Sequence, residues 1–218
     1  MMQHLIIFTR AAQLGSVKRR LAADIGALAA LRFHRAMQTQ LAQGTGKDRR
    51  WKTWVATTPD IRTKNSFNSR GGFAFLKQGR GDLGQRMAHC FRTLPPGPAV
   101  LIGSDIPGVT RQHIAEAFAQ LGENDAVFGP ATDGGYWLAG LKRLRPIGGP
   151  HGRNLFSDVR WSSPHALADT IGAMGPRARI SYVNTLSDVD NAADYHHWRR
   201  LCSSRRGMIS TKLQGLNR

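Results

Sequence analysis

The chain has 218 residues, of which 41% are hydrophobic and 8% aromatic, values typical of a folded protein with a sizeable core. Lysine and arginine outnumber aspartate and glutamate by 31 to 14, which gives a formal net charge of +17 at pH 7. No apolar stretch approaches the ~20 residues of a membrane-spanning helix, and Cys90 and Cys202 lack metal-site spacing, so we expect unpaired thiols in a cytoplasmic protein.

The positive charge is concentrated in residues 1–95, which hold 17 of the lysines and arginines but only four of the acidic residues. Such a balance suits a nucleic acid, an anionic membrane surface or a phosphate-rich small molecule, although an arginine-rich solvated surface explains it more simply. The sequence shows no helix-turn-helix, zinc-finger or RNA-recognition motif, so a nucleic-acid partner is not favoured. A nucleotide ligand is compatible with this charge.

The first predicted elements are a strand over residues 5–8, a loop with one glycine, and a single long helix over residues 21–41. This layout directs backbone N–H groups and the positive end of a helix at an anion. With Ser16 as helix N-cap, Lys18 and Arg20 fall near the first turn, where they oppose the helix dipole unless a diphosphate binds between them. The alternative is a basic helix start on the surface.

A glycine-rich segment follows two further predicted strands, at residues 51–57 and 73–76. Residues 78–87 contain three glycines within six positions, which permit backbone conformations closed to other residues and a close approach to a ligand. Glycine-rich turns before helices are also common without a ligand. Asp82 has the position of an ordinary cap for a helix over residues 83–94.

The fold class is indicated by apolar runs at residues 99–102, 126–128 and 136–139, each short enough for a buried strand. Strands that are apolar on both faces need cover on both sides, so we expect a three-layer α/β/α domain with a mostly parallel central sheet. Ligands in such folds bind beyond the carboxyl ends of the strands, and Asp105 follows the first of these runs. Asp105 is therefore either a turn residue or a cation ligand.

Two further helix starts are visible in the sequence. Thr110 is a good N-cap, but His113 stands where a capping box has Glu or Gln, so we expect only half of that box. Ser163 followed by Pro164 predicts a helix that ends near residue 173. Trp161, just before it, is interpreted as a packing residue.

The segment Asp133-Gly134-Gly135 lies between two predicted strands. Because no side-chain bulk follows the acid, the backbone can pass close to a ligand with Asp133 exposed beside it. A tight turn between strands is the alternative interpretation.

A second acidic group follows a predicted strand over residues 179–183. Residues two apart in an extended segment point the same way, so Asp188 and Asp190 face one direction. Two carboxylates ~4 Å apart repel by ~4 kcal/mol at an effective dielectric near ~20, and a divalent cation between them turns this into attraction. Helix capping is the alternative, but Asn191 with Asp194 can form the cap and leave Asp190 free.

We expect one domain over residues 1–202 and a basic, disordered tail over residues 203–218. Two internal segments are predicted to be mobile: the polar residues 61–71 and the Gly/Pro-rich residues 145–153, the latter as a rim over the pocket.

The motifs I-G-S-D-I-P-G (102–108) and D-A-V-F-G-P-A-T-D-G-G-Y-W-L-A-G-L (125–141) resemble a family of small bacterial transferases with the glycosyltransferase-A fold. Members are commonly labelled glycosyltransferases, some in connection with arsenosugar biosynthesis. The pattern is more distantly similar to guanylyltransferases that act on phospholactate or the molybdenum cofactor. The resemblance extends in pieces from about residue 8 to about residue 198. It departs from the family pattern at Arg19, where threonine is common, and at Ala12, where proline is common.

This resemblance implies a role for each candidate residue. The catalytic cation, Mg²⁺ or Mn²⁺, would be bound by the hard oxygen ligands of Asp105, Asp188 and Asp190. The nucleotide and its phosphates would be bound by Arg10, Gly15, Lys18, Arg20, Gly81, Asp82 and Arg86. The donor or acceptor would be contacted by Asp133, Gly134 and Gly135. The residues closest to the chemistry would be Asp105, Lys18 and Arg20.

We therefore expect a Mg²⁺- or Mn²⁺-dependent transferase that uses a nucleotide-activated donor and a small-molecule acceptor. The family label favours glycosyl transfer, whereas the Lys-x-Arg loop and the paired late aspartates favour nucleotidyl transfer to a phosphorylated acceptor. A third alternative is a non-catalytic anion or RNA binder attracted by the net charge. The sequence favours no particular oligomeric state. The transferase hypothesis requires Asp105 to lie within about 10 Å of the Asp188/Asp190 pair.

Overall fold

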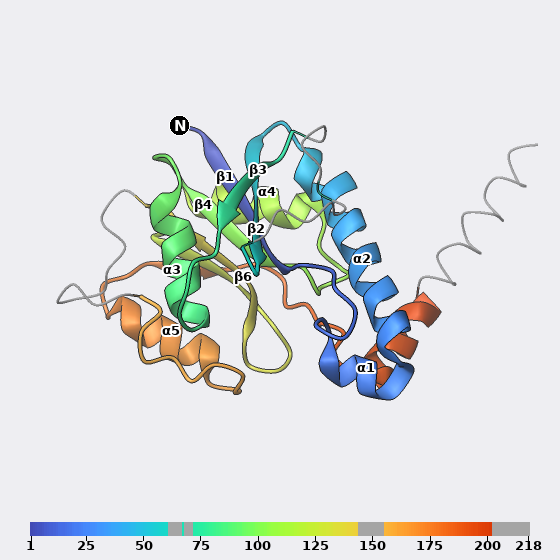
Figure 1. Cartoon of the computed structure of the whole chain (residues 1–218). Coiled ribbons are helices and arrows are strands. Elements are labelled where there is room, and N and C mark those ends of the chain that lie inside the picture. The colour runs from blue at the N-terminus through green and yellow to red at the C-terminus, as the bar shows by residue number, and fades with distance from the viewer. Residues whose placement is uncertain (61–66, 68–71, 144–154, 202–218) are drawn as a thin grey trace, which may run out of the picture.

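The computed structural model describes residues 1–60, 67, 72–143 and 155–201. Within them, a seven-stranded sheet runs through the molecule in the order β3-β2-β1-β4-β6-β5-β7, with helices on both faces (Figure 1). The strands are β1 (Gln3–Arg10), β2 (Trp51–Thr58), β3 (Ala74–Lys77), β4 (Ala99–Gly103), β5 (Ala126–Pro130), β6 (Tyr136–Leu141) and β7 (Ile180–Tyr182). The helices are α1 (Arg19–Ile25), α2 (Ala27–Gln43), the short 3-10 helix η1 (Thr45–Lys47), α3 (Leu83–Thr93), α4 (Arg111–Gln120), α5 (Ala166–Met174) and a last helix over residues 192–201.

The sheet is mostly parallel, as expected. β3, β2, β1 and β4 are parallel neighbours, β7 is parallel to β5, and β6 alone among the described strands runs antiparallel to both of its neighbours. The predicted strands are all present, with ends that shift by a few residues. This confirms the three-layer α/β/α prediction.

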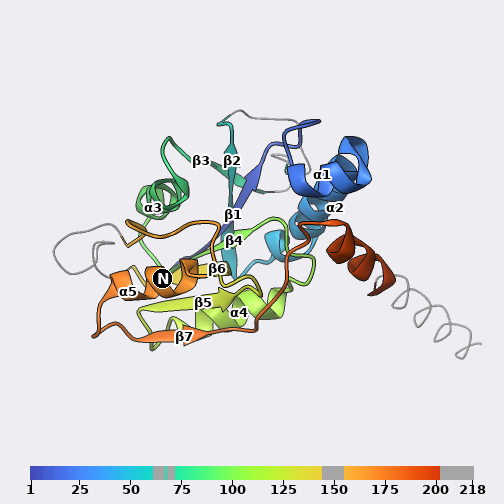
Figure 2. The ribbon, with the colours of Figure 1, turned by 90° about the horizontal axis from the view of Figure 1, so that it is seen from below.

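The sheet separates two hydrophobic cores because alternate residues of its strands point to opposite faces. Leu5 and Ile7 of β1 join the core beneath α2 and α4, whereas Ile6 joins the core beneath α3 and α5. All three side chains are fully buried. Figure 2 shows the same division, with α3 and α5 on one side of the sheet and α2 and α4 on the other.

One edge of the sheet collects the acidic loops. β1, β4 and β5 all run toward this edge, because β6 is antiparallel to both β4 and β5. The turn between β5 and β6, residues 131–135, therefore lies at the same edge. A bridge between Ala131 and Leu186 brings the segment after β7 to it as well. Asp105, Asp133 and Asp188 thus approach one another from three separate parts of the chain.

The prediction of one long helix over residues 21–41 was wrong. Gly26 interrupts it with φ 86° and separates α1 from α2, a backbone conformation that glycine adopts at little cost. Ser16 is not the N-cap: its hydroxyl donates to the carbonyl of Gln13. Lys18 takes the N-cap position instead, with left-handed backbone angles of φ 49° and ψ 51°.

The capping predictions had mixed outcomes. Before α4, Nδ1 of His113 accepts from the backbone N–H of Thr110 while Thr110 accepts from that of His113, so the box is complete and the expectation of half a box was wrong. The Asn191 and Asp194 cap of the last helix is confirmed by reciprocal bonds of 3.0 and 3.3 Å. α5 begins two residues after Pro164, and the Ser163 hydroxyl accepts from the backbone N–H of His165 at 3.2 Å.

Three predictions concern residues outside the described part of the chain: most of 61–71, residues 145–153 and the tail at 203–218. Among the described helices, none combines the length and the apolar character needed to span a bilayer.

Candidate functional site

The centre of the site is a buried ammonium group between two carboxylates. Nζ of Lys18 lies 3.1 Å from Oδ2 of Asp105 and 2.8 Å from Oδ1 of Asp190, and the Lys18 side chain is only 5% exposed. Since Asp105 and Asp190 contact the same nitrogen, their contacting oxygens are at most about 6 Å apart, which meets the distance requirement of the transferase hypothesis for Asp190. Arg20 approaches the same cluster from solvent, with Nη1 3.9 Å from Oδ2 of Asp190.

Lys18 reaches this position through an unusual backbone. Its left-handed angles place it at the turn between the loop after β1 and the start of α1. A non-glycine residue pays roughly 1–3 kcal/mol for such a conformation unless surrounding contacts over-determine it. Burial alone would lower the pKa of Lys18, but Asp105 and Asp190 raise it overall, so the ammonium stays charged. The two ion pairs are the contacts that hold the strained residue in place.

Asp105 follows β4 and is fixed by a polar network beneath it. Nδ1 of His34, on α2, lies 3.3 Å from Oδ1 of Asp105, and the Ser104 hydroxyl donates to the same oxygen at 3.3 Å. Thr9 donates to Ser104 at 2.8 Å. Burial would raise the pKa of Asp105, but the hydrogen bond from His34 and the charge of Lys18 lower it to about 2. Asp105 is therefore an ionised carboxylate at any physiological pH.

Asp188 differs from the other two carboxylates. It forms no ion pair with a described residue, and burial followed by the negative charge of Asp190 raises its pKa to about 6. Asp133 adds to this rise and Lys18 partly offsets it, so all four groups lie within electrostatic reach of one another. In the described residues no three acidic, His or Cys side chains meet in a metal-binding cluster. The three predicted metal ligands therefore do not form a closed metal site here: Asp105 and Asp190 contact the Lys18 ammonium, and Asp188 is linked to them by its electrostatic interaction with Asp190 and Lys18.

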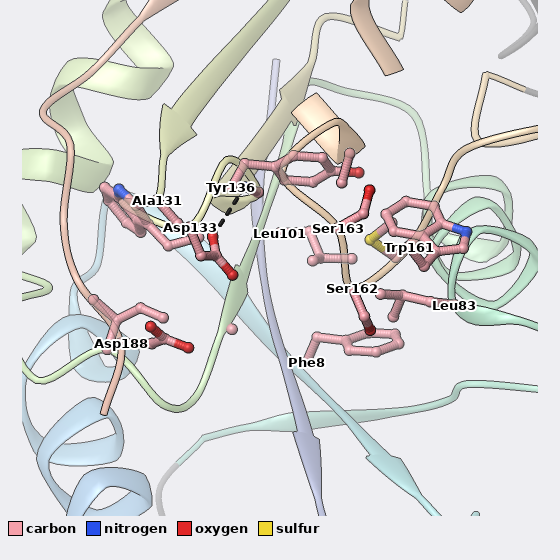
Figure 3. Close-up of a pocket in the computed structure, with 16 residues that line it drawn as sticks. Phe8, Leu83, Leu101, Ala131, Asp133, Tyr136, Trp161, Ser162, Ser163 and Asp188 are labelled. Carbon is pink, nitrogen blue, oxygen red and sulfur yellow. Dashed lines mark hydrogen bonds between the residues drawn. The ribbon is translucent and has the colours of Figure 1, made fainter. Parts of the chain in front are cut away.

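A cavity of about 270 Å³ opens beside this cluster (Figure 3). Asp133 and Asp188 lie on one side of it, and Phe8 and Trp161 lie on the other. Trp161 packs edge-on against Tyr136 with ring centroids 6.3 Å apart, so it is both a packing residue, as predicted, and a wall of the cavity. Among the described residues that line the cavity, the charged ones are both carboxylates.

The Asp133-Gly134-Gly135 turn is shaped by its packing as well as by the cavity. Oδ1 of Asp133 accepts from the backbone N–H of Gly135 at 2.9 Å. Gly134 has φ 85°, and a Cβ at this position would overlap the backbone of Pro164. The carbonyl of Gly134 accepts from the N–H of Leu167 at 3.2 Å. Asp133 and Gly135 line the cavity, whereas Gly134 allows the turn to pack against the loop before α5.

The remaining predicted phosphate residues lie at the end of β1, in the loop after it, and at or near the start of α3. Arg86 donates to Oε1 of Gln78 and lies over the Phe8 ring at 5.3 Å. Burial, and then the positive charge of Arg10, lower the pKa of Arg86, so these two cations lie within electrostatic reach of each other. Gly81 (φ 105°) turns the chain into α3, where Asp82 forms a capping box with Gln85. Asp82 is thus a helix cap, and its nucleotide role stays a prediction. Gly15 (φ 76°) lies in the loop after β1, with open space around its Cβ position.

Sequence reasoning missed the residues that support Asp105. His34 and Gln38 are 2% and 0% exposed and lie one turn apart on the inward face of α2. Nε2 of Gln38 donates to the Thr9 hydroxyl at 3.0 Å and to the Arg10 carbonyl at 2.9 Å. The available signal was the pair of polar residues at i and i+4 within the apolar stripe of a helix.

The fold is that of a nucleotide-diphospho-sugar transferase-like α/β protein. The chain belongs to the family described as "Uncharacterized protein conserved in bacteria (DUF2064)", whose model matches residues 40–163. No curated protein matches it in sequence.

Solved structures share the fold. A protein from Desulfovibrio desulfuricans G20, provisionally described as a nucleotide-diphospho-sugar transferase, is 25% identical, with 88% of this chain and 84% of that chain covered and a TM-score of 0.76. CMP:2-keto-3-deoxy-manno-octonic acid synthetase in complex with CTP is 13% identical (94% and 100% covered, TM-score 0.56). Rv0371c from Mycobacterium tuberculosis H37Rv, in complex with manganese, is also 13% identical (90% and 97% covered, TM-score 0.51). The last two show a common fold alone.

Proposed function

We propose that this protein is a divalent-metal-dependent transferase that uses a nucleotide-activated sugar as donor and a hydroxyl group as acceptor. The observation that carries the proposal is the Asp105–Lys18–Asp190 cluster at the carboxyl ends of the strands, which is linked through Asp188 to a cavity with one aromatic and one acidic side. The solved structures that share the fold include one provisionally described as a nucleotide-diphospho-sugar transferase and one bound to manganese, which supports the proposal by similarity.

The donor set fits a hard divalent cation. Asp105 is ionised, Asp190 already binds a cation, and Asp188 is a third carboxylate without an ion-pair partner in the described residues. Mg²⁺ and Mn²⁺ favour such oxygen ligands and are commonly bound by one or two carboxylates together with substrate phosphates. When bound, the cation would neutralise the charge that develops on the leaving diphosphate.

The protein's own residues would do the rest. Lys18 and Arg20 would bind phosphate oxygens, since both reach the carboxylate cluster where the diphosphate would lie. The rings of Phe8 and Trp161 would hold the sugar and exclude water. In the reaction the acceptor oxygen bonds to the sugar carbon, the bond to the diphosphate breaks, and a nucleoside diphosphate leaves. Asp133 lies on the acidic side of the cavity, where it would accept the proton of the acceptor hydroxyl as the new bond forms.

The cavity favours a neutral acceptor over a phosphorylated one. Nucleotidyl transfer needs an acceptor phosphate, a dianion that would be placed here against Asp133 and Asp188. Like charges close together repel, and Asp133, which is not assigned to the cation, has no basic side chain beside it in the described lining. Nucleotidyl transfer nevertheless remains the second candidate, because Lys18 and Arg20 beside paired aspartates also suit attack at the α-phosphorus of a nucleoside triphosphate.

The products distinguish the two reactions. Purified protein is incubated with Mn²⁺ and either nucleotide sugars or nucleoside triphosphates, with sugars, polyols and sugar phosphates as acceptors. Release of nucleoside diphosphate from a nucleotide sugar supports glycosyl transfer, and pyrophosphate release from a triphosphate supports the second candidate. Asp105→Asn should abolish either activity, whereas Asp169→Asn, which removes a surface ion pair with Arg160, serves as the control. RNA binding that persists in Asp105→Asn and Asp188→Asn, without turnover, would instead support a non-catalytic binder.

A further inference from the structure

The position of Lys18 has a consequence for how this site takes up a cation. A long, flexible side chain brings its ammonium group between Asp105 and Asp190, the oxygens to which a divalent cation would bind. The group is buried, and its backbone adopts a conformation that lysine rarely takes. Glycine would adopt these backbone angles at a lower cost than lysine. The presence of lysine therefore indicates that its side chain has a role at this position.

A divalent cation and this ammonium cannot share the two carboxylates. Mg²⁺ lies about 2.0–2.1 Å from its oxygen ligands, whereas Nζ already lies 3.1 and 2.8 Å from the same two carboxylates. The two positive groups would then be only a few ångströms apart in a partly buried site, where repulsion is strong. One of them must leave.

We propose that the Lys18 ammonium is a resident counter-cation that holds the carboxylates together in the metal-free protein and is exchanged for the divalent cation when the donor diphosphate binds. This inference rests on the proposed function. After the exchange, Nζ regains negative partners on the diphosphate oxygens, which would lie on the other side of the cation. Metal and nucleotide therefore bind cooperatively: each alone faces an unfavourable step, and together they supply new partners to every charge.

The surrounding groups are consistent with such an exchange. Asp105 keeps its bonds to His34 and Ser104 when the ammonium leaves, so its position does not depend on Lys18 alone. Asp190 also keeps a contact that does not involve Lys18, because its backbone N–H donates to Oδ2 of Asp194 at 3.1 Å. Asp188 gains the cation it lacks among the described residues. The cluster can therefore change its cation without losing its shape.

The test measures Mn²⁺ affinity by electron paramagnetic resonance in wild type and Lys18→Met, each with and without a nucleoside diphosphate. The exchange predicts that Lys18→Met binds Mn²⁺ at least about tenfold more tightly than wild type when no nucleotide is present. It also predicts that the nucleoside diphosphate strengthens Mn²⁺ binding strongly in wild type and only weakly in the variant.

Arg20→Met is the matched control, measured without nucleotide. It removes a positive charge near the same carboxylate, but the Arg20 side chain is 81% exposed and lies 3.9 Å away, so the change in Mn²⁺ affinity should stay within about threefold. Lys18→Arg, which keeps the charge, should bind Mn²⁺ as weakly as wild type. Lys18→Gln repeats the measurement if the Met variant folds poorly.

Unchanged or weaker nucleotide-free Mn²⁺ binding in both Lys18→Met and Lys18→Gln would overturn the exchange while leaving the metal site and the proposed function intact. A failure of wild type and of both variants to bind Mn²⁺, even with nucleoside diphosphate present, would overturn the proposed function and the exchange with it.

Discussion

Nδ1 of His34 lies 3.3 Å from Oδ1 of Asp105, so a buried residue of α2 holds the carboxylate at the end of β4. Partners of this kind orient a ligand and commonly change metal affinity by ~10–100-fold when removed. The contact makes His34 a positioning residue in the proposed site.

We expect His34→Ala to weaken Mn²⁺ binding in the presence of nucleoside diphosphate by about tenfold, because Asp105 loses its orientation. His34→Asn should recover part of this loss, since an amide N–H can replace the donor. The measurement is a Mn²⁺ titration with nucleoside diphosphate at a fixed concentration.

The control is His4→Ala, which removes another buried histidine, hydrogen-bonded to Trp54 and close to the Pro96 carbonyl, far from the carboxylates in sequence. It should lower the melting temperature without changing Mn²⁺ affinity. Equal effects of the two alanine variants on Mn²⁺ binding would contradict the positioning role.

The raised pKa of Asp188 predicts a pH-dependent stability of the metal-free protein. Its pKa is about 6 in the folded protein and 3.8 in the unfolded chain, so the folded state binds the proton more tightly. Between about pH 4 and pH 6 the free energy of unfolding should therefore fall as pH rises, and this contribution levels off above pH 6. Asp188→Asn removes it, so the variant's melting temperature should decline less than that of wild type over this interval.

Asp169 affects the free energy of unfolding with the opposite pH dependence. The hydrogen bond and charge of Arg160 lower the pKa of Asp169 to about 2, so its contribution to stability is present above about pH 4 and is lost as pH falls toward 2. Asp169→Asn should leave the slope between pH 4 and 6 almost unchanged. If the melting temperatures of wild type and Asp188→Asn change in parallel over that range, the pKa of Asp188 is not raised in the folded protein.

The Asp133-Gly134-Gly135 turn predicts a contrast between two glycines. Gly134→Ala places a Cβ against the backbone of Pro164 at a φ of 85° and should lower the free energy of unfolding by at least ~2 kcal/mol. Gly172→Ala adds a methyl group in open space on α5 and should raise it by ~0.5–1 kcal/mol. Chemical denaturation of both variants checks the pair. A mild effect at Gly134 would mean that the loop before α5 can move away from the turn.

Trp161 tests the aromatic side of the cavity. Trp161→Ala should raise the KM for the acceptor or the sugar part of the donor by about tenfold, or ~1.4 kcal/mol, while the affinity for nucleoside diphosphate stays close to wild type. Trp54→Ala removes a tryptophan of β2 that contacts His4 of β1 and is absent from the cavity lining, so the KM values of this variant should stay near those of wild type. If the Trp161 variant loses nucleotide affinity instead, the cavity binds the base and not the sugar.

Much of the fold could be predicted because its signals are local. The runs at residues 99–102 and 126–128 are apolar on both faces, which indicates buried strands whatever the rest of the chain does. Gly26 was missed because the apolar stripe of the predicted helix continues across it. α1 and α2 both pack against the last helix, a contact between distant residues that leaves no local signal.

The site could be predicted only in part, because several of its contacts join residues that are far apart in the sequence. Strand ends indicated Asp105, and the alternation of an extended segment indicated Asp188 and Asp190. Asp190, one of the two partners of Lys18, is 172 positions away, and Asp105 is 71 positions from His34, so neither contact leaves a local signal. Lys18 was expected to face phosphates, and only the folded chain places it between the carboxylates.

The most direct test of the proposed metal site is a calorimetric titration of Mn²⁺ into wild type and Asp105→Asn, each saturated with nucleoside diphosphate. Asparagine keeps the shape of the side chain and removes its charge, so the fold and the contact with His34 should survive. We expect one Mn²⁺ site in wild type and at least about tenfold weaker binding in the variant. Equal Mn²⁺ affinity in the two proteins would contradict the proposed metal site.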